Sequence, residues 1–207
     1  MRAPAELFLA SSNPGKLSEF RALATAANAP DTASSLVEIA LLPDFDSLPS
    51  FEEDAPTFAE NAAGKALHYS RLAERLVIAD DSGLVVPALG GAPGVRSARY
   101  AGADATNEER ITKLLGELRE KERAVRGAHF VCALALAQRG RAIAIITACV
   151  NGTILETPRG SGGFGYDPVF YFPALKKSFA ELLPEEKNLH SHRGKAFRRL
   201  LGALPNL

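Results

Sequence analysis

Cysteine, methionine and tryptophan are scarce in this 207-residue chain, which has two cysteines, one methionine and no tryptophan. Cys132 and Cys149 each lie in an apolar run, and no CxxC or Cys/His spacing accompanies them. Redox and metal-binding roles are therefore disfavoured for both residues. We expect reduced thiols in the core, where small apolar side chains are common.

An excess of either charge is also lacking, because 24 Lys and Arg residues balance 24 Asp and Glu residues. Proteins that bind the nucleic acid backbone usually carry a basic excess, so a small ligand is expected rather than nucleic acid. The apolar runs are shorter than the roughly 18 residues of a membrane-spanning helix. Residues 1–6 have no signal-peptide pattern. We expect no membrane span, no signal peptide and a cytoplasmic location.

Strand and helix patterns alternate along the chain. Its 46% hydrophobic residues are enough for a sizeable core, as one domain over residues 1–207 or as two closely packed lobes. The predicted strands are residues 6–10, 36–41, 76–79, 128–138, 142–150, 152–156 and 169–172. Helix-capping patterns occur at Asn13-Pro14, Thr57 with Glu60, Thr106 with Glu109, and Ser191. Crossovers give parallel strands, and a hairpin around Arg139-Gly140 gives antiparallel ones. The predicted fold class is α/β with a mixed sheet.

The turn between the first strand and the first helix has the ingredients of a phosphate site. It contains Ser11, Ser12, Asn13, Pro14, Gly15 and Lys16. Free amides, the positive end of a helix dipole and one ammonium group would meet there. With one glycine and no Ser or Thr after Lys16, the turn does not match the P-loop pattern. A plain capped helix is the alternative interpretation.

Asp80 and Asp81 follow four apolar residues, so we expect them where a strand ends, the usual place of ligands in α/β sheets. Adjacent carboxylates repel each other unless a cation or donor hydrogen bonds compensate, and carboxylate oxygens suit Mg²⁺. A turn that merely favours aspartate is the alternative. Ser82 stands where a haloacid-dehalogenase-type phosphatase would have its second aspartate.

Three further segments are candidates for binding, each with a structural alternative. Glu52, Glu53 and Asp54 are either a metal-binding or a solvated acidic loop. The glycine-rich residues 160–168 suit either base stacking or a turn with buried rings. A third group of donors, made up of Lys187, His192 and Arg193, could equally be a basic surface at a helix end.

Taken together, these segments resemble the inosine triphosphate pyrophosphatase family, also called the Ham1 family. The resemblance extends over nearly the whole chain. It rests on ASSNPGK at 10–16, TFAENA at 57–62, ADDSGL at 79–84, LGGAPG at 89–94, GGFGYDP at 162–168, EK at 186–187 and SHRG at 191–194. Several ordered motifs at once make coincidence improbable.

The resemblance implies Mg²⁺-dependent hydrolysis of non-standard purine nucleoside triphosphates (ITP, dITP, XTP) to the monophosphate and pyrophosphate, which cleanses the nucleotide pool. It also implies an elongated mixed sheet flanked by helices, two lobes with the active site in the cleft, and a homodimer. Residues 11–16 would bind phosphate. Glu52 and Asp81 would hold Mg²⁺, and Asp81 would accept the proton with support from Asp80.

Further substrate contacts are implied from eight residues: Ser82, Phe164, Gly165, Tyr166, Asp167, Lys187, His192 and Arg193. Where the family often has Glu-Thr-Gly after its first glutamate, this chain has Glu53-Asp54-Ala55, so the choice between Glu52 and Glu53 stays open. Donors on His192 and Arg193 would favour a 6-oxo purine over adenine.

Three alternatives remain. A Maf-like pyrophosphatase for modified pyrimidine nucleotides would share the reaction, but the segment 162–168 favours the inosine triphosphate type. Intact Asp80 and Asp81 disfavour a nucleotide-binding regulator without turnover. The zero net charge disfavours an RNA-binding module.

Overall fold

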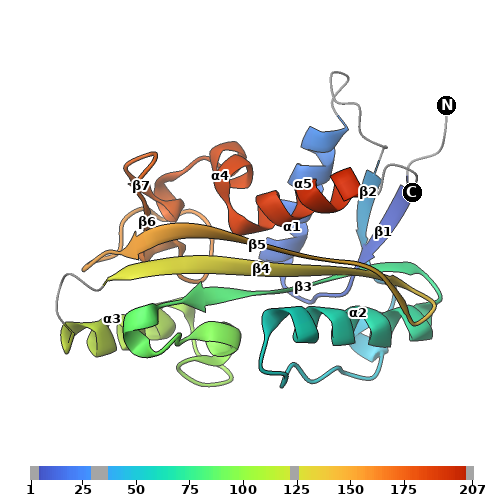
Figure 1. Ribbon diagram of the computed structural model, residues 1–207, viewed down its shortest axis with the longest axis horizontal. Helices are drawn as coiled ribbons and strands as arrows, with labels where there is room; N and C mark the ends of the chain where they lie inside the picture. Colours follow the sequence, from blue (N-terminus) through green and yellow to red (C-terminus); the bar gives the residue numbers. More distant parts are fainter. Residues whose placement is uncertain (1–4, 29–36, 122–125, 204–207) are drawn as a thin grey trace. The chain divides into compact units, whose positions relative to one another are not determined.

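The computed structural model describes residues 5–28, 37–121 and 126–203, and Figure 1 labels its helices and strands. The strands are β1 (Ala5–Leu9), β2 (Val37–Leu41), β3 (Leu76–Val85), β4 (Gly127–Gln138), β5 (Arg141–Ile154), β6 (Phe170–Phe172) and β7 (Lys177–Ser178). The helices are α1 (Pro14–Ala27), α2 (Phe58–Ala73), α3 (Asn107–Arg119), α4 (Pro184–His190) and α5 (His192–Ala203). None of the helices within this described part is long and apolar enough to cross a membrane.

The strands form one seven-stranded sheet in the order β2-β1-β3-β4-β5-β6-β7. Its pairing is mixed, because β1 pairs in parallel with β2 and β3, whereas β6 pairs antiparallel with β5 and β7. The crossover through α1 gives the parallel pairing of β1 with β2, and the short connection between β6 and β7 permits their antiparallel pairing. The predicted α/β class with a mixed sheet is confirmed.

Strand boundaries differ from the prediction by more than one residue at two places. β3 continues through Asp80 and Asp81 to Val85, and residues 152–154 complete β5 rather than forming a new strand. α2 ends at Ala73, because Glu74 adopts a left-handed conformation with φ of 51°. Leu36, the predicted start of the second strand, lies outside the described residues.

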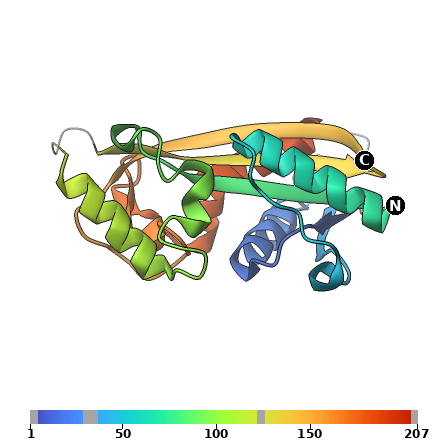
Figure 2. The same cartoon turned by 90° about the horizontal axis from the view of Figure 1, so that it is seen from below.

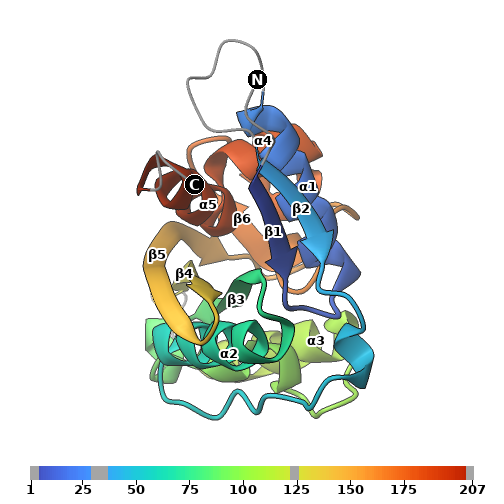
Figure 3. The same cartoon turned by 90° about the vertical axis from the view of Figure 1, so that its right-hand side faces the viewer.

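Two compact units divide the chain, and the first contains the described residues up to Asp81, Cys132–Ala148 and the residues from Arg193 onward. Its core has two apolar layers, one on each face of the strands. Leu7 and Leu9 of β1 pack with α1 and α5, whereas the alternate residues Phe8 and Ala10 pack with α2. Figure 3 shows α1 and α5 on one side of β1 and α2 on the other.

The second unit contains Ser82–Val131 and Cys149–His192. Its core joins α3 to the aromatic residues of β4 and β6, with Phe130 and Phe170 ring centroids 4.5 Å apart. Figure 2 shows α3 beside the loops that follow β3, and Leu89 and Tyr100 of those loops pack against this core.

The two cysteines are both thiols but differ in environment. Cys132 of β4 is fully buried, as predicted. The same prediction is wrong for Cys149, which is exposed. In β5 the alternate positions Ala148 and Val150 face the core, so the residue between them points to solvent although its neighbours are apolar.

Replacing Leu134 of β4 by alanine should lower the free energy of unfolding by about 2–5 kcal/mol, because the side chain is fully buried and the change leaves a cavity. The matched control is Ile145→Ala in β5, whose side chain is 47% exposed. This control should cost less than about 1 kcal/mol. Urea denaturation of both variants measures the difference, and equal losses would contradict the described core.

Candidate functional site

The turn before α1 folds around Asn13. Its Oδ1 accepts hydrogen bonds from the amides of Gly15 at 2.9 Å and Lys16 at 3.2 Å, and the Asn13 amide donates to Ser11 Oγ at 3.2 Å. The predicted cap with Pro14 at the first helical position is confirmed. The expectation of free amides is wrong for these three groups, which donate within the turn. What the turn offers an anion is the positive end of α1 together with the Lys16 ammonium group.

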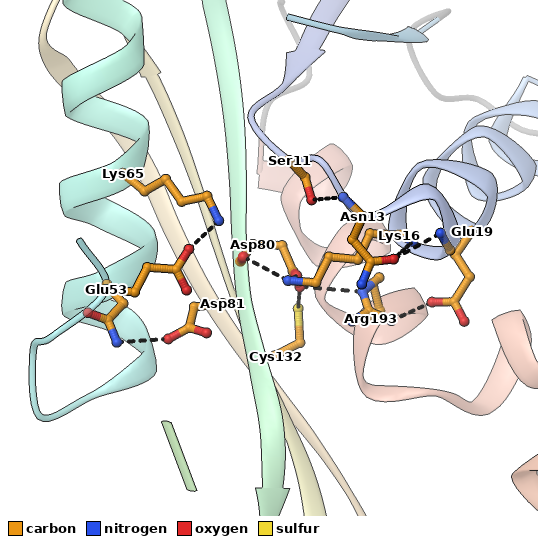
Figure 4. A network of polar contacts seen from close by, with 12 residues as sticks. Ser11, Asn13, Lys16, Glu19, Glu53, Lys65, Asp80, Asp81, Cys132 and Arg193 are labelled. Atoms are coloured by element: carbon orange, nitrogen blue, oxygen red, sulfur yellow. Dashed lines mark hydrogen bonds and ion pairs between the residues drawn. The ribbon is translucent and has the colours of Figure 1, made fainter. Parts of the chain in front are cut away.

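The strand geometry of β3 separates the two aspartates. Successive side chains of a strand point to opposite faces, and Ile78 packs on the α1 and α5 side whereas Ala79 packs on the α2 side. Asp80 therefore points toward α1 and α5, and Asp81 toward α2, as Figure 4 shows. The expectation that a strand ends at these residues is wrong, because each carboxylate has its own polar partners and can stay in the sheet.

Asp80 is buried, with a relative exposure of 1%, and is surrounded by donors. The Lys16 ammonium group forms an ion pair with Oδ1 and also donates to the Asp80 backbone carbonyl at 3.2 Å. Oδ2 accepts from Cys132 Sγ at 3.2 Å and from Arg193 Nε at 3.4 Å. A buried carboxylate is tolerated when charge and hydrogen bonds compensate it, as they do here.

Arg193 lies at the start of α5 and is 2% exposed. Besides its contact with Asp80, its Nη1 forms an ion pair with Glu19 of α1. Burial lowers the pKa of Arg193, but the adjacent carboxylates of Asp80 and Glu19 outweigh it and raise the pKa overall, so the guanidinium stays charged. The structure thus gives Arg193 a role in compensating Asp80 that the sequence did not suggest.

Asp81 occupies a different environment. Its Oδ2 accepts a hydrogen bond from Asn61 Nδ2 of α2 at 3.0 Å. Burial raises the pKa of Asp81 from 3.8 to about 6; the Asn61 bond opposes this shift and the charge of nearby Glu53 adds to it. Asp81 is therefore a buried carboxyl group that titrates close to neutrality, as a proton acceptor must.

Glu53 completes the acidic group on the α2 side. Its carboxylate forms an ion pair with Lys65 of α2, and Figure 4 shows it between Lys65 and Asp81. Glu52 is exposed and has its side chain in solvent. Within the described ranges no cluster of three or more His, Cys, Asp or Glu residues is found. The neighbouring carboxylates of Asp81 and Glu53 suit Mg²⁺, which usually keeps several waters or phosphate oxygens as ligands.

In the second unit, Asp167 organises the glycine-rich loop. Its Oδ2 accepts from the Phe164 amide at 2.8 Å and from Lys187 Nζ at 2.6 Å. The same ammonium group lies 4.8 Å from the centre of the Phe164 ring. Gly163 has φ of 70°, and a Cβ there would collide with the Asp167 carboxylate. The loop therefore holds a lysine, a carboxylate and a half-buried ring close together.

Tyr166 and His192 are packed more tightly than a purely ligand-binding role requires. Tyr166 is 4% exposed and its hydroxyl donates to the Ser97 carbonyl at 2.9 Å. The His192 ring stacks on Phe130 with centroids 4.7 Å apart. The surroundings of Tyr166 therefore fit the alternative interpretation of this segment, a turn with a buried ring. Phe164 is the better candidate for stacking on a base, and Gly165 and Ser82 are both half-buried.

Comparison with known proteins agrees with this arrangement of motifs. The model of the Ham1 family matches residues 7–203. The chain belongs to the Ham1 family. A dITP/XTP pyrophosphatase of Geobacillus kaustophilus (strain HTA426) is 52% identical over 195 residues, which cover 94% of this chain and 92% of the relative. Another dITP/XTP pyrophosphatase, of Gloeobacter violaceus (strain ATCC 29082 / PCC 7421), is 49% identical with the same coverage.

Solved structures of Ham1 proteins have the same fold. A HAM1 protein from Coxiella burnetii superposes with a TM-score of 0.83 at 42% identity, covering 98% of this chain and 100% of that one. The Ham1 protein of Staphylococcus aureus gives a TM-score of 0.80 at 37% identity, with 96% and 97% covered. The resemblance inferred from the sequence is confirmed at the level of family and fold.

Four partners in the polar network were not given roles by the sequence: Glu19, Asn61, Lys65 and Cys132. Asn61 lies in the segment 57–62, one of those on which the resemblance to the Ham1 family rests, so the sequence could have indicated its importance. Lys65 follows Asn61 by four residues and so shares its helix face. Glu19 and Cys132 had no signal, because a glutamate in an amphipathic helix and a cysteine in an apolar strand are ordinary there.

Asp81→Asn should stabilise the metal-free protein at neutral pH. Because its folded pKa is raised, the folded state binds a proton more tightly than the unfolded chain. Ionised Asp81 therefore costs stability as pH rises from 3.8 to about 6, and the cost persists above that pH. The gain should be about 1–3 kcal/mol at pH 7 and near zero at pH 4.

Urea denaturation with EDTA across this pH range measures the gain. The matched control is Asp54→Asn, an exposed carboxylate of the same acidic segment, which should change little. A gain for Asp81→Asn that is the same at pH 4 and pH 7 would contradict the raised pKa.

Proposed function

We propose that the chain is a nucleoside triphosphate pyrophosphatase that hydrolyses dITP, XTP and ITP to the monophosphate and pyrophosphate. Its support is twofold. The relatives described above carry the name dITP/XTP pyrophosphatase and match 94% of the chain. The observation that carries the proposal in the structure is Asp81, a buried carboxyl group with a pKa near 6 beside Glu53 and close to the lysine-bearing turn before α1.

The phosphates are bound by the positive groups of the first unit. Lys16 is held by Asp80 at the start of α1, with 16% of its side chain exposed. Lys65 stands on the α2 side of β3, next to Glu53. Phosphate oxygens are matched by ammonium groups and by a helix N-terminus, and none of these contacts depends on the base. In the second unit, Lys187 with Phe164 is a further candidate contact for the substrate.

The residues around Asp81 fit a divalent cation, and Mg²⁺ is the proposed one. Asp81 and Glu53 would hold it; Glu53 replaces Glu52 in the proposal, because Glu53 is the glutamate whose carboxylate lies beside Asp81. When bound, Mg²⁺ neutralises phosphate charge and favours the departure of pyrophosphate. Its positive charge would also hold the two carboxylates in their ionised form.

Asp81 is the proposed proton acceptor. An ionised Asp81 can accept a proton from a water that is aligned for attack on the α-phosphorus. Asn61 orients the carboxylate through its bond to Oδ2. Asp80 points to the opposite face of β3 and acts on the reaction through Lys16, as a positioning residue.

Selection of the base is proposed to depend on hydrogen-bond donors that face the 6-position of the purine. A 6-oxo purine accepts hydrogen bonds from His192, Arg193 and nearby amides, whereas the 6-amino group of adenine presents a donor to a donor. Each buried mismatch costs about 1–3 kcal/mol. Arg193 also compensates Asp80 and Glu19, so its replacement affects phosphate binding as well as the base.

We treat residues 1–207 as one functional domain, because the family match runs over residues 7–203 and each of β3, β4 and β5 contributes to both units. Homodimerisation and a cytoplasmic location stay predictions.

Pyrophosphate release with Mg²⁺ from XTP, dITP, ITP, GTP, ATP and dUTP tests the proposal. The 6-oxo, non-standard purines should be hydrolysed with the highest kcat/KM. Asp81→Asn should fold and lose at least about 100-fold in kcat, since it cannot accept the proton. Asp54→Asn is the control and should retain activity. A preference for modified pyrimidine nucleotides would favour a Maf-like enzyme, and tight binding without turnover a regulator.

Arg193→Ala should reduce the ratio of kcat/KM for ITP to that for ATP by about tenfold, because a donor to the 6-oxo group is lost. Glu19→Gln is the matched control. It removes the charge of the other Arg193 partner and should affect both nucleotides by the same factor. The measurement is kcat/KM for ITP and for ATP in the wild type and in each variant. An unchanged ITP-to-ATP ratio in Arg193→Ala would contradict this role and indicate that the loop of Phe164 selects the base.

A further inference from the structure

Cys132 belongs both to an apolar layer of the core and to the polar network of Asp80. It lies on β4, where Leu134 and Leu136 face the same core cluster of α1 and α5. Its side chain is fully buried, and Sγ lies 3.2 Å from Asp80 Oδ2, within hydrogen-bonding distance for sulfur. A thiol is a weak donor, but the acceptor is a buried carboxylate, and hydrogen bonds to ionised groups are stronger than neutral ones.

The contact fixes the rotation of the Asp80 carboxylate. Oδ1 is directed to the Lys16 ammonium group, and Oδ2 is directed to Cys132 and Arg193. The Arg193 contact is long, at 3.4 Å, and the guanidinium is also drawn to Glu19. The thiol is the shorter of these two contacts to Oδ2. Weakening it frees the carboxylate to rotate away from the position that meets Lys16.

Lys16 depends on this position because its ammonium group is bound to Asp80 twice, through Oδ1 and through the backbone carbonyl. A lysine that is already fixed loses less conformational freedom when a phosphate arrives, so binding is tighter. The orientation of Asp80 therefore affects, through Lys16, how tightly phosphate binds.

We propose that Cys132 is a positioning residue for the triphosphate: its thiol donates to Asp80 and so holds Lys16 ready for the phosphates. The inference rests on the proposed function in one respect, that the turn at residues 11–16 binds phosphate. It assigns a role to a thiol that otherwise belongs to the core.

The first experiment compares three variants with the wild type in kcat and KM for XTP and ITP. Cys132→Val has similar volume and no donor, and should raise KM about 3- to 10-fold for both nucleotides with kcat within about twofold. Cys132→Ser retains a donor and should stay within about twofold of the wild-type KM. Cys149→Ala, at the exposed thiol, should leave both constants unchanged.

A double-mutant cycle separates positioning from packing. In a Lys16→Met background, Cys132→Val should raise KM by less than about twofold, because the residue through which the thiol acts has gone. If Cys132→Val raises KM by the same factor with and without Lys16, the proposal is wrong and Cys132 only packs. Equal losses for Cys132→Ser and Cys132→Val would overturn it as well.

Two further measurements do not depend on hydrolysis of a nucleotide. The chain has two cysteines, so a Cys149→Ala variant leaves Cys132 as its sole source of an infrared S–H stretching band. This band should move to higher wavenumber when Asp80→Asn is added, and an unmoved band would refute the hydrogen bond. Calorimetric titration with inorganic triphosphate should give a Kd about 3- to 10-fold higher for Cys132→Val than for wild type.

An equal Kd in that titration would refute the link to phosphate. Should the wild type hydrolyse no nucleoside triphosphate, the proposed function fails, while the infrared band and the titration still decide the role of Cys132.

Discussion

The alternation of side chains along β3 governs the chemistry of the first unit. Two neighbouring aspartates in a strand point to opposite faces, so Asp80 and Asp81 can differ in protonation and in partners although one peptide bond joins them. The cations Lys16 and Arg193 and the Cys132 thiol surround Asp80 and compensate its charge. Burial and, to a smaller extent, the charge of Glu53 raise the pKa of Asp81, while its hydrogen bond from Asn61 opposes the rise. A single strand thus separates a carboxylate that is paired with cations from one whose pKa is raised.

Each face owes its partners to the helix that covers it. α1 supplies Lys16 and Glu19 to the Asp80 side, three residues apart and therefore on one helix face. α2 supplies Asn61 and Lys65 to the other side with a spacing of four. The same helical periodicity places Phe20 and Ala66 in the apolar layers. Packing and electrostatics are consequently set by one pattern, and a shift of either helix would disturb both.

Much of the fold was predictable because local rules decided it. Asn13-Pro14 and Thr106 with Glu109 are capping patterns that operate over three or four residues, and the structure has both. The length of β3 was not predictable in this way. Two aspartates in succession usually end a strand, and only partners far along the chain, among them Arg193 and Cys132, make them stable inside one. Similarly, Glu52 and Glu53 look equivalent in the sequence, and the distinction comes from Lys65 twelve positions later.

The glycine-rich loop of the second unit has an implication for how its sequence can vary. Asp167 lies where a side chain at residue 163 would have to go, and it also holds the Phe164 amide and Lys187. A methyl group at Gly163 would push the Asp167 carboxylate away from the Phe164 amide and from Lys187. A substitution at Gly163 therefore requires a change at Asp167 as well, so the two positions constrain each other.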